Sequence, residues 1–265
     1  MADNPGISVL MTTYNRERYV EAAIRSVLAS TFSDFELIVV DDGSTDRTAA
    51  IVAQLAAEDH RVALHINPQN LGDYPNRNRA ASLAKGKYLK YVDADDLIYP
   101  WGLQILWECM EKHPDAGWGL CSLVQDKQRI YPFVLNPLEA YRYHYLGPGL
   151  FHKAPLSSII KRIVFKDVGG FRHDRMVSDN EMWHRLALHH NVVLINQGVV
   201  WYRTHDTQES NEINKFERLY EAIRREYLAH PDCPLTNKEL VMIEAKNRRA
   251  KQKLALIRFA KKFVR

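Results

Sequence analysis

The sequence predicts an α/β fold: a mostly parallel sheet flanked by helices, followed by a C-terminal helical extension. Short apolar, β-branched runs alternate with segments of helical spacing over about the first 125 residues. Helical crossovers between strands favour a parallel sheet. The chain has 265 residues, of which 46% are hydrophobic, and this is enough apolar material for a large core.

The first half of the chain has the patterns of four strands separated by helices. Apolar runs at 7–11 and 35–40 are typical of buried parallel strands. Between them apolar residues recur at helical spacing, so a helix is expected across 16–30. The later elements are a helix at 46–58, a strand at 61–66, a helix at 76–86 that ends at Gly86, and a strand at 87–93.

The second half has a weaker pattern. Residues 125–175 are rich in aromatic residues and proline without a clear period, so we expect loops and short elements that cover the ligand site. The segment Thr236–Glu239 reads TNKE, a capping box that predicts the start of a last helix. The other expected elements are a helix at 179–190, short strands at 192–196 and 199–205, and a helix at 214–230.

Basic residues are concentrated near the C-terminus. From Lys238 to Arg265 there are ten Lys and Arg against two Glu, whereas the rest of the chain has more acidic than basic residues. From Gln252 onward a helical wheel separates apolar side chains from Lys and Arg, with Leu254 as the exception. This pattern is typical of a helix on an anionic membrane surface. A helix packed on the domain with a solvated basic face is the alternative.

The sequence argues against several function classes. Three widely spaced cysteines show neither metal-type spacing nor a disulfide framework, so reduced thiols in the cytoplasm are expected. The N-terminus lacks a signal-peptide pattern, and no 18-residue apolar run is present. Dinucleotide-binding, P-loop and zinc-protease motifs are absent. Basic and aromatic residues are not interleaved on the main body, which argues against nucleic acid as a partner.

Three aspartates follow the fourth expected strand, in YVDADD: Asp93, Asp95 and Asp96. Crowded carboxylates repel one another, so we expect a positive charge beside them, either a neighbouring lysine or a metal ion. Mg²⁺ or Mn²⁺ suits carboxylates that also face phosphates. Asp96 also has the position of a cap for the following helix, and we expect that role for it.

A second acidic pair, Asp41 and Asp42 in VVDDGSTD, ends the second strand. Gly43 permits a tight turn, and Ser44 or Thr45 suits the cap of the next helix. A plain strand–helix turn does not explain the doubled aspartate. Because ligands bind at the carboxyl ends of parallel strands, this pair and YVDADD are expected to face one crevice.

Seven motifs occur in order: ISVLMTTYN, LIVVDDGSTDRT, NLGDYPNRNRA, GKYLKYVDADD, VGGF, SDNEMWHRLA and WYRTH. Together they resemble the family-2 glycosyltransferases with the GT-A fold, of the bacterial surface-polysaccharide type. The resemblance implies a GT-A domain over residues 1–210, with a nucleotide-binding half at about 1–125 and an acceptor-side half at about 126–210. Residues 211–265 would form a helical extension with a basic amphipathic tail.

The resemblance also implies the donor site. Asp42 would bond to the nucleotide base and Asp93 would reach the ribose, while Asn76 stands where the family often has a small residue. Asp95 and His205 would hold a Mn²⁺ or Mg²⁺ ion that binds the diphosphate. The implied nucleotide-binding residues are Thr13, Tyr14, Asp42, Arg77, Asn78 and Asp93.

The motif SDNEMWHRLA implies the catalytic base. Asp179, at the start of a helix, would take the proton from the acceptor hydroxyl, and Ser178 replaces a glutamate that is usual in the family. A helix N-terminus favours the ionised carboxylate, although the same position suits a helix cap. The implied reaction is a single displacement that inverts the anomeric centre.

The implied substrates are a nucleotide-diphospho-sugar, with UDP as the expected nucleotide, and a glycan or lipid-linked acceptor at the inner face of the membrane. Two alternatives stay open. A sugar-phosphate nucleotidyltransferase would use a similar site but would form pyrophosphate. A catalytically silent sugar-nucleotide-binding subunit would bind UDP without turnover.

Overall fold

The computed structural model describes residues 4–205 and 215–261. It confirms the α/β class and the mostly parallel sheet. Four strands of the N-terminal half pair in parallel, and each lies within two residues of its expected bounds. They are β1 (Ile7–Thr13), β2 (Phe35–Asp41), β3 (Val62–Ile66) and β4 (Tyr88–Tyr91).

Three helices connect these strands: α1 (Val20–Leu28), α2 (Thr48–Glu58) and α3 (Asp73–Leu83). α3 begins three residues before the expected start at 76. Gly72 precedes it with a φ of 88°, which glycine adopts readily. Asp73 then lies in the first turn, where a carboxylate is favourable beside the free N–H groups. This earlier start places Asp73 one turn before Arg77.

The second half of the chain completes the sheet. Residues 125–175 contain loops and short elements, as expected, but one of the short strands lies inside the central sheet and not over the ligand site. The elements are β5 (Leu97–Ile98), α4 (Gly102–Lys112), β6 (Ala116–Leu123), β7 (Phe133–Leu135), α5 (Pro137–Tyr145), the 3₁₀ turn η1 (Pro155–Ser157), β8 (Ser158–Lys161), α6 (Arg162–Asp167), α7 (Ser178–His189), β9 (Asn191–Asn196) and β10 (Val200–Trp201).

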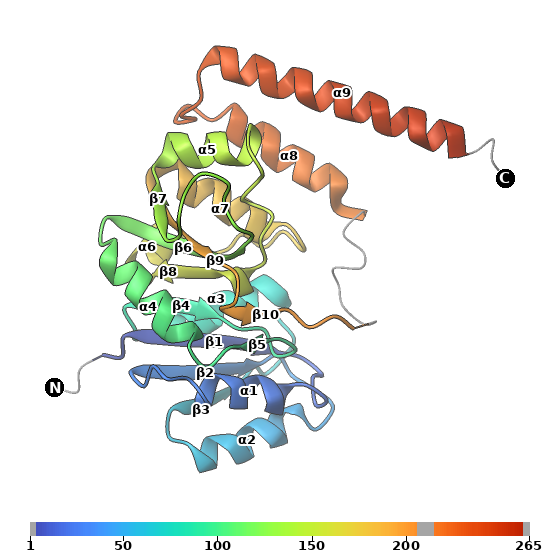
Figure 1. Ribbon diagram of the computed structural model, residues 1–265. Coiled ribbons are helices and arrows are strands. Elements are labelled where there is room, and N and C mark those ends of the chain that lie inside the picture. The colour runs from blue at the N-terminus through green and yellow to red at the C-terminus, as the bar shows by residue number, and fades with distance from the viewer. Residues whose placement is uncertain (1–3, 206–214, 262–265) are drawn as a thin grey trace.

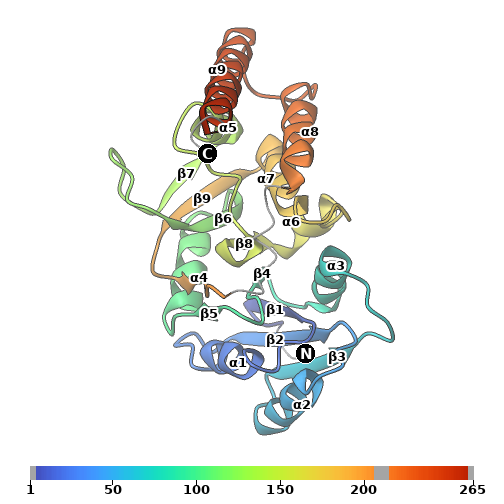
Figure 2. The ribbon, with the colours of Figure 1, turned by 90° about the vertical axis from the view of Figure 1, so that its right-hand side faces the viewer.

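The described strands form an eight-stranded sheet with the order β3-β2-β1-β4-β8-β6-β9-β7, and β5 pairs separately with β10. β8 is antiparallel to both of its neighbours, β4 and β6. It has only four residues, so no sequence period could reveal it. Figures 1 and 2 show the N-terminal strands at one end of the molecule and the C-terminal helices at the other.

Both faces of the sheet are covered by helices. Alternate residues of β1 and β2 point to opposite faces, as a pleated strand requires. Val9 and Leu37 belong to the core beneath α1, α2 and α4, whereas Leu10 and Ile38 belong to the core beneath α3, α5, α6 and α7. Because both faces are buried, the strands are mostly apolar, and most polar side chains gather at the strand ends.

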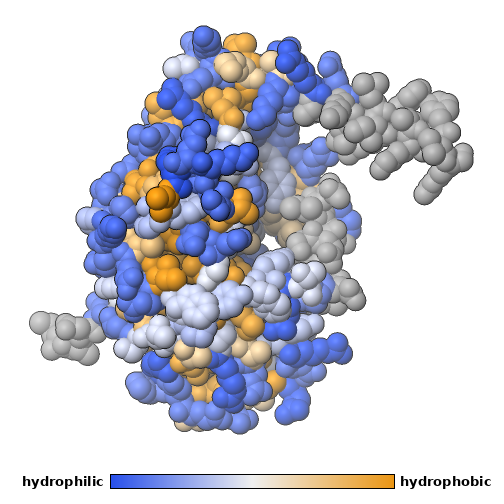
Figure 3. Space-filling view, in the orientation of Figure 1, coloured by the Kyte–Doolittle hydropathy of each residue, from blue (hydrophilic) through white to orange (hydrophobic). Residues whose placement is uncertain are grey.

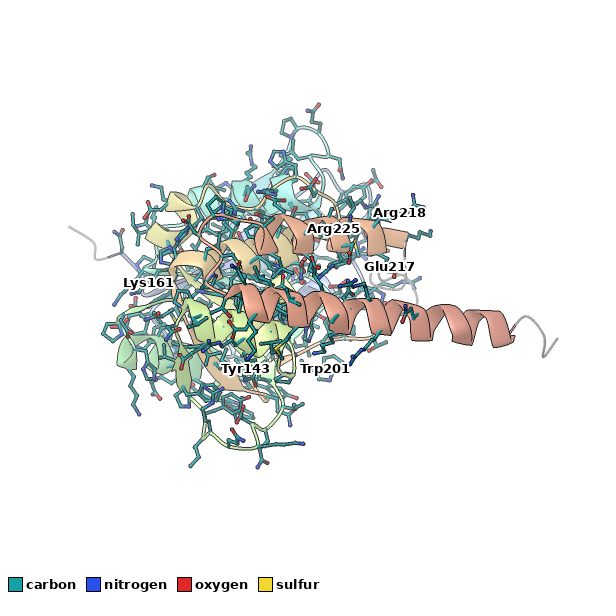
Figure 4. The ribbon with its side chains drawn as sticks, turned by 90° about the horizontal axis from the view of Figure 1, so that it is seen from above. Tyr143, Lys161, Trp201, Glu217, Arg218 and Arg225 are labelled. Atoms are coloured by element: carbon teal, nitrogen blue, oxygen red, sulfur yellow. The ribbon has the colours of Figure 1, made fainter. Side chains whose placement is uncertain are left out.

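The C-terminal segment contains α8 (Glu217–Leu228) and α9 (Asn237–Lys261). The predicted capping box is confirmed: Thr236 N–H donates to Glu239 Oε2 at 2.9 Å, and Glu239 N–H donates to Thr236 Oγ1 at 3.4 Å. α9 packs through Ile243, and Lys246 Nζ donates to the Tyr145 carbonyl at 3.2 Å. Beyond these contacts α9 extends past the body of the protein (Figures 1 and 4).

The predicted amphipathic arcs from Gln252 onward fall mainly on side chains outside those that the structure describes. The first residues of the helix expected at 214–230 also lie partly outside the described ranges. Among the helices of residues 4–205 and 215–261, none has the length and apolar character needed to cross a membrane.

Candidate active site

The two acidic motifs lie at the same edge of the sheet. β1 pairs in parallel with β2 on one side and with β4 on the other, so the carboxyl ends of the three strands point to the same edge. Thr13 lies opposite Asp41 in the pairing register. The Asp42 N–H donates to the Thr13 carbonyl at 2.8 Å. Asp42 and Asp93 therefore follow strands that flank β1, as the sequence predicts.

Asp42 is buried and fixes the loop that leads into α3. Its Oδ1 accepts hydrogen bonds from Asn67 Nδ2 at 2.6 Å and from Leu71 N at 2.9 Å. Its Oδ2 accepts from Gly72 N at 2.9 Å. Asn67 Nδ2 also donates to Asn76 Oδ1 at 3.0 Å. These hydrogen bonds connect the loop after β3 and the first turn of α3 to the end of β2.

Asp41 shapes the turn that follows β2. Its Oδ1 accepts from Ser44 N at 2.8 Å and its Oδ2 accepts from Ser44 Oγ at 2.5 Å. The prediction that Ser44 or Thr45 caps the next helix is wrong, because the N-cap of α2 is Arg47. Instead Asn15 Oδ1 accepts from Thr45 N at 2.8 Å, and Asn15 N–H donates to Ser44 Oγ at 2.9 Å.

Asn76 and Asn78 on α3 make backbone contacts. Asn76 is buried and its Nδ2 donates to the Val40 carbonyl at 3.1 Å. Its side-chain amide is therefore bonded to the backbone of β2. Asn78 Nδ2 donates to the Phe171 carbonyl at 2.8 Å, and its Oδ1 accepts from Phe171 N at 2.9 Å. Asn78 thus anchors the VGGF motif, and its contact with the nucleotide stays a prediction.

Arg77 is a buried cation between two carboxylates. Its Nε donates to Asp73 Oδ1 and its Nη1 donates to Asp93 Oδ1, both at 2.7 Å. Burial alone would lower the pKa of Arg77, but these carboxylates outweigh it and raise the pKa well above the ordinary value. Burial also raises the pKa of Asp93, although Arg77 opposes the rise. An arginine, not a lysine, is thus the partner of Asp93.

Asp95 contacts two basic side chains through one oxygen. Asp95 Oδ2 accepts from Arg16 Nε at 3.1 Å and lies 3.1 Å from His205 Nε2. The His205 ring stacks on Tyr19, with 4.8 Å between the ring centroids. The predicted pair of Asp95 and His205 is therefore brought together, although they are 110 residues apart.

Asp96 does not cap a helix, and that prediction is wrong. α4 begins only at Gly102, and Asp96 Oδ1 accepts from the backbone N–H of Arg203 at 2.8 Å. Burial, reinforced by the charge of Asp93, raises the pKa of Asp96 to about 8. The fully buried Lys90 lies beneath these acids and donates to the Leu156 carbonyl. Burial lowers its pKa, while nearby acids oppose that change.

A divalent cation fits the donor atoms of Asp95 and His205. Within the described ranges no three or more His, Cys, Asp or Glu side chains are grouped so that they could hold a metal ion by themselves. One carboxylate oxygen and one imidazole nitrogen are nevertheless a suitable set for Mn²⁺ when phosphate oxygens supply further ligands. The fit therefore requires a phosphate-bearing substrate.

Asp179 lies half-buried in the first turn of α7, and its Oδ1 accepts from Asn180 N at 2.7 Å. Its own N–H donates to Tyr74 Oη at 3.3 Å. Burial raises the pKa of Asp179 to about 7, whereas the Asn180 N–H and the Arg77 charge lower it. The expectation that the helix N-terminus favours the ionised form is therefore outweighed by burial. A carboxyl with this pKa suits a proton acceptor near neutral pH.

The turn before Asp179 is held from α8. Met176 has a φ of 67°, in the left-handed region that a residue with a side chain rarely adopts. Tyr220 Oη donates to the Met176 carbonyl at 2.8 Å. Ser178 is fully buried and donates to the Asp174 carbonyl at 2.8 Å. Ser178 thus stabilises this turn, and its hydroxyl faces the protein interior.

Thr13 and Tyr14 end β1 in different environments. Thr13 is buried, and its Oγ1 has no hydrogen-bond partner among the described residues. The same holds for Asn67 Oδ1, beside Asp42. Tyr14 is 45% exposed. Two buried polar atoms near the carboxyl ends of β1 and β3 therefore have hydrogen-bonding capacity to spare for a polar ligand.

Sequence reasoning missed Arg16, Lys90 and Tyr220. Arg16 directly follows the TTYN motif, so its position at a strand end was a usable signal. Lys90 interrupts the apolar run YLKYV, and a lysine in a buried strand is a signal in itself. Tyr220 lies 44 residues from its partner Met176, and no local pattern links them.

Comparison with known proteins identifies relatives of the chain. The model of "Glycosyl transferase family 2" matches residues 8–169. An uncharacterised glycosyltransferase of Methanocaldococcus jannaschii is 36% identical over 115 residues, covering 43% of this chain and 40% of that protein. One of Rickettsia typhi is 28% identical over 254 residues, covering 91% and 76%. The matched segment thus spans less than half of the Methanocaldococcus protein.

Solved structures share the fold. Residues 1–349 of S. aureus TarS in complex with UDP-GlcNAc match with a TM-score of 0.70 at 21% identity, covering 91% of this chain and 70% of that one. The mannosyltransferase PcManGT from Pyrobaculum calidifontis, in complex with GDP-Man and Mn²⁺, matches with a TM-score of 0.61 at 16% identity, covering 94% and 76%. At these identities the likeness shows the fold, which is the GT-A fold of glycosyltransferases.

Proposed function

Because the chain belongs to glycosyl transferase family 2, we propose that it is a metal-dependent, inverting hexosyltransferase that uses a nucleotide-diphospho-sugar. One observation carries the proposal. Asp42, Asp93, Asp95 and Asp179 come from three separate segments, and contacts through α3 and the segment after β1 connect them at one edge of the sheet. A donor and an acceptor hydroxyl could meet there.

The nucleotide belongs, in this proposal, at the ends of β1 and β2. The unpartnered Thr13 Oγ1 and Asn67 Oδ1 beside Asp42 suit the polar edge of a base. Exposed Tyr14 would border the base, and Arg77 and Asp93 would face the ribose. The complex of TarS with UDP-GlcNAc supports UDP as the nucleotide, although PcManGT holds GDP-Man in the same fold.

Asp95 and His205 would hold the Mn²⁺ or Mg²⁺ ion, which when bound acts as a Lewis acid that stabilises charge on the leaving diphosphate. The complex of PcManGT with Mn²⁺ supports this assignment. Arg77 keeps Asp93 oriented through their contact at 2.7 Å. The protein's part in the reaction is therefore to orient the donor and to neutralise its charge.

Asp179 would accept the proton of the attacking hydroxyl. Its pKa of about 7 keeps a large ionised fraction available at neutral pH. Tyr74 and Asn180 fix its position through the backbone and carboxylate contacts described above. In this proposal the hydroxyl attacks the anomeric carbon directly, on the face opposite the diphosphate, and this inverts the anomeric centre.

The surface beside the acidic edge supports a glycan or lipid-linked acceptor. Trp201 is 42% exposed, and the Arg203 guanidinium lies 5.2 Å from the centroid of its ring. Figure 3 shows pale surface of intermediate hydropathy over β5 and β10. An apolar pocket of about 370 Å³ lies there, between Ala29, Tyr99 and Trp201. Aromatic faces with polar edges suit sugars, and an apolar pocket suits a lipid portion.

Asp95→Ala is expected to lower Mn²⁺-dependent release of nucleoside diphosphate by about 10²–10³-fold, because a preorganised charge at the leaving group is lost. The measurement is a screen of UDP-, GDP- and dTDP-sugars with and without Mn²⁺. It follows the diphosphate released, whereas a nucleotidyltransferase would instead form pyrophosphate.

Asp167→Ala is the matched control, since Asp167 is an exposed carboxylate on α6, away from the site. It should keep the wild-type rate. Full activity of Asp95→Ala would show that the metal assignment is wrong. A wild type that releases no diphosphate from any donor would remove the proposed function itself.

Deletion of residues 250–265 is expected to lower binding to anionic liposomes by more than about tenfold and to spare donor hydrolysis. Each well-placed Lys or Arg near an anionic surface contributes about 1 kcal/mol, and the site residues above lie outside this segment. Binding is measured by co-sedimentation with phosphatidylserine vesicles, and neutral vesicles are the control. Equal binding by the truncated protein would argue against a peripheral membrane role for the tail.

A further inference from the structure

Arg16 occupies the position at which the proposed function requires a cation. Its Nε donates to Asp95 Oδ2 at 3.1 Å, the same oxygen that faces His205 Nε2. Its Nη1 donates to the carbonyls of Tyr14 and Asn15, each at 3.3 Å. These contacts hold the guanidinium against a carboxylate that also faces His205 and lies close in sequence to Asp93 and Asp96.

The backbone of Arg16 is fixed while its side chain reaches solvent. Arg16 N–H donates to Thr48 Oγ1 at 2.7 Å. The preceding Asn15 has a φ of 52° and is bonded through its backbone and its side chain to Ser44 and Thr45. The Arg16 side chain is 29% exposed. The guanidinium can therefore change partners by rotating its own side chain, without movement of the sheet edge.

His205 does not depend on Arg16 for its place. Its ring stacks on Tyr19 at 4.8 Å between centroids, with 23° between the ring planes. The Arg203 guanidinium lies 5.3 Å from the centroid of the same tyrosine ring. Tyr19 thus links the segment after β1 to the residues that follow β10. If Arg16 turns away, these contacts keep His205 beside Asp95.

We propose that Arg16 is a counter-charge that exchanges partners: it neutralises Asp95 in the free protein and binds the donor diphosphate when a divalent cation binds Asp95. The inference rests on the proposed metal-dependent function. A cation and a guanidinium at the same oxygen would repel each other. A guanidinium released from Asp95 can instead offer paired N–H donors to phosphate oxygens.

This exchange makes cation and donor binding cooperative. Without a diphosphate, the cation competes with Arg16 for Asp95 Oδ2. With a diphosphate bound, Arg16 has a second anionic partner and its contact with Asp95 no longer opposes the cation. By linkage, the nucleoside diphosphate strengthens cation binding by the same factor as the cation strengthens nucleotide binding.

The test measures Mn²⁺ dissociation constants of the full chain by electron paramagnetic resonance, with and without UDP. Without UDP, Arg16→Gln should bind Mn²⁺ about two- to fivefold more tightly than wild type, the strength of a partly exposed ion pair. The enhancement of Mn²⁺ binding by UDP should fall about tenfold in this variant. Arg16→Lys keeps the charge without the planar donors, and its enhancement of Mn²⁺ binding by UDP should lie between those of wild type and Arg16→Gln.

Arg18→Gln is the matched control, because Arg18 is exposed two residues along the same segment. If Arg18→Gln tightened Mn²⁺ binding as much as Arg16→Gln does, the change would reflect net charge alone, and the inference would be overturned. Unchanged constants in Arg16→Gln, with a wild type that binds Mn²⁺ more tightly with UDP, would overturn the inference alone. If the wild type bound no Mn²⁺ even with UDP, the metal-dependent function would fail and the inference with it.

Discussion

Replacement of Asp179 by Asn is expected to lower the rate of sugar transfer by about 10²–10⁴-fold, the contribution of a positioned general base. Asn keeps the shape of the side chain and can still accept the Asn180 N–H, which lies 2.7 Å from Oδ1. It cannot accept the proton of the acceptor hydroxyl. Turnover is measured as UDP release, and UDP binding by calorimetry should persist.

The pH dependence of the wild type follows from the same group. Burial raises the pKa of Asp179 to about 7, and the base is active only when ionised. kcat/KM, which reports the free enzyme, should therefore rise with pH and level off above about 7. Asp179→Asn should lack this rise. A silent sugar-nucleotide-binding subunit would instead show no turnover in either protein.

Asp179→Asn is also expected to stabilise the unliganded protein at alkaline pH. The folded pKa of about 7 lies above the unfolded value of about 3.9, so the folded state binds this proton more tightly. Wild-type stability is therefore lost as pH rises from about 4 through about 7. The difference between the folded and the unfolded pKa corresponds to a loss of about 4 kcal/mol in the free energy of unfolding at most. Urea unfolding at pH 8 should favour the variant, and at pH 4 the two should agree.

Glu181→Ala is expected to reduce the free energy of unfolding by about 3–5 kcal/mol, the cost of breaking a buried ion pair from one side. Glu181 is fully buried. Its carboxylate lies 3.1 Å from Arg172 Nε and 2.8 Å from Arg185 Nη2, and it accepts a hydrogen bond from the Tyr227 hydroxyl. Alanine leaves these donors facing a cavity. Urea unfolding followed by circular dichroism measures the loss.

The exposed Glu244 on α9 gives the matched control. Glu244→Ala should change stability by less than about 0.5 kcal/mol. The Glu181 contacts join α7 to α8 through Tyr227 and to the VGGF motif through Arg185, which also donates to the Gly170 carbonyl at 2.7 Å. A stability of Glu181→Ala equal to that of the control would contradict the role of this buried cluster.

The sequence predicted much of the candidate site because its signals are local. Asp42 and Asp93 follow apolar runs whose length and composition are typical of buried strands, and both lie at the predicted edge. Asp95 and Asp179 were found by motif. β8 was not predicted because four residues are too few to show a hydrophobic period. Its place between β4 and β6 depends on pairing with strands far away in the chain.

The roles of charged residues were harder to predict than their positions. Asp96 looked like a helix cap, yet its partner is the backbone of Arg203, 107 residues away. Asp179 looked ionised at a helix N-terminus, yet burial raises its pKa to about 7. Each error has the same origin, since local rules count only sequence neighbours and omit the partners that folding supplies.

The amino-acid sequence alone determined the order of the elements of the N-terminal half, the acids at the strand ends and the family resemblance, because periodicity and turn chemistry depend on nearby residues. The tertiary structure decided which charges meet and which are desolvated. Arg16 pairs with Asp95 across 79 residues, and Asp179 loses water to neighbours on other elements. Electrostatic energies depend on distance in space and on burial, and only the folded chain defines both.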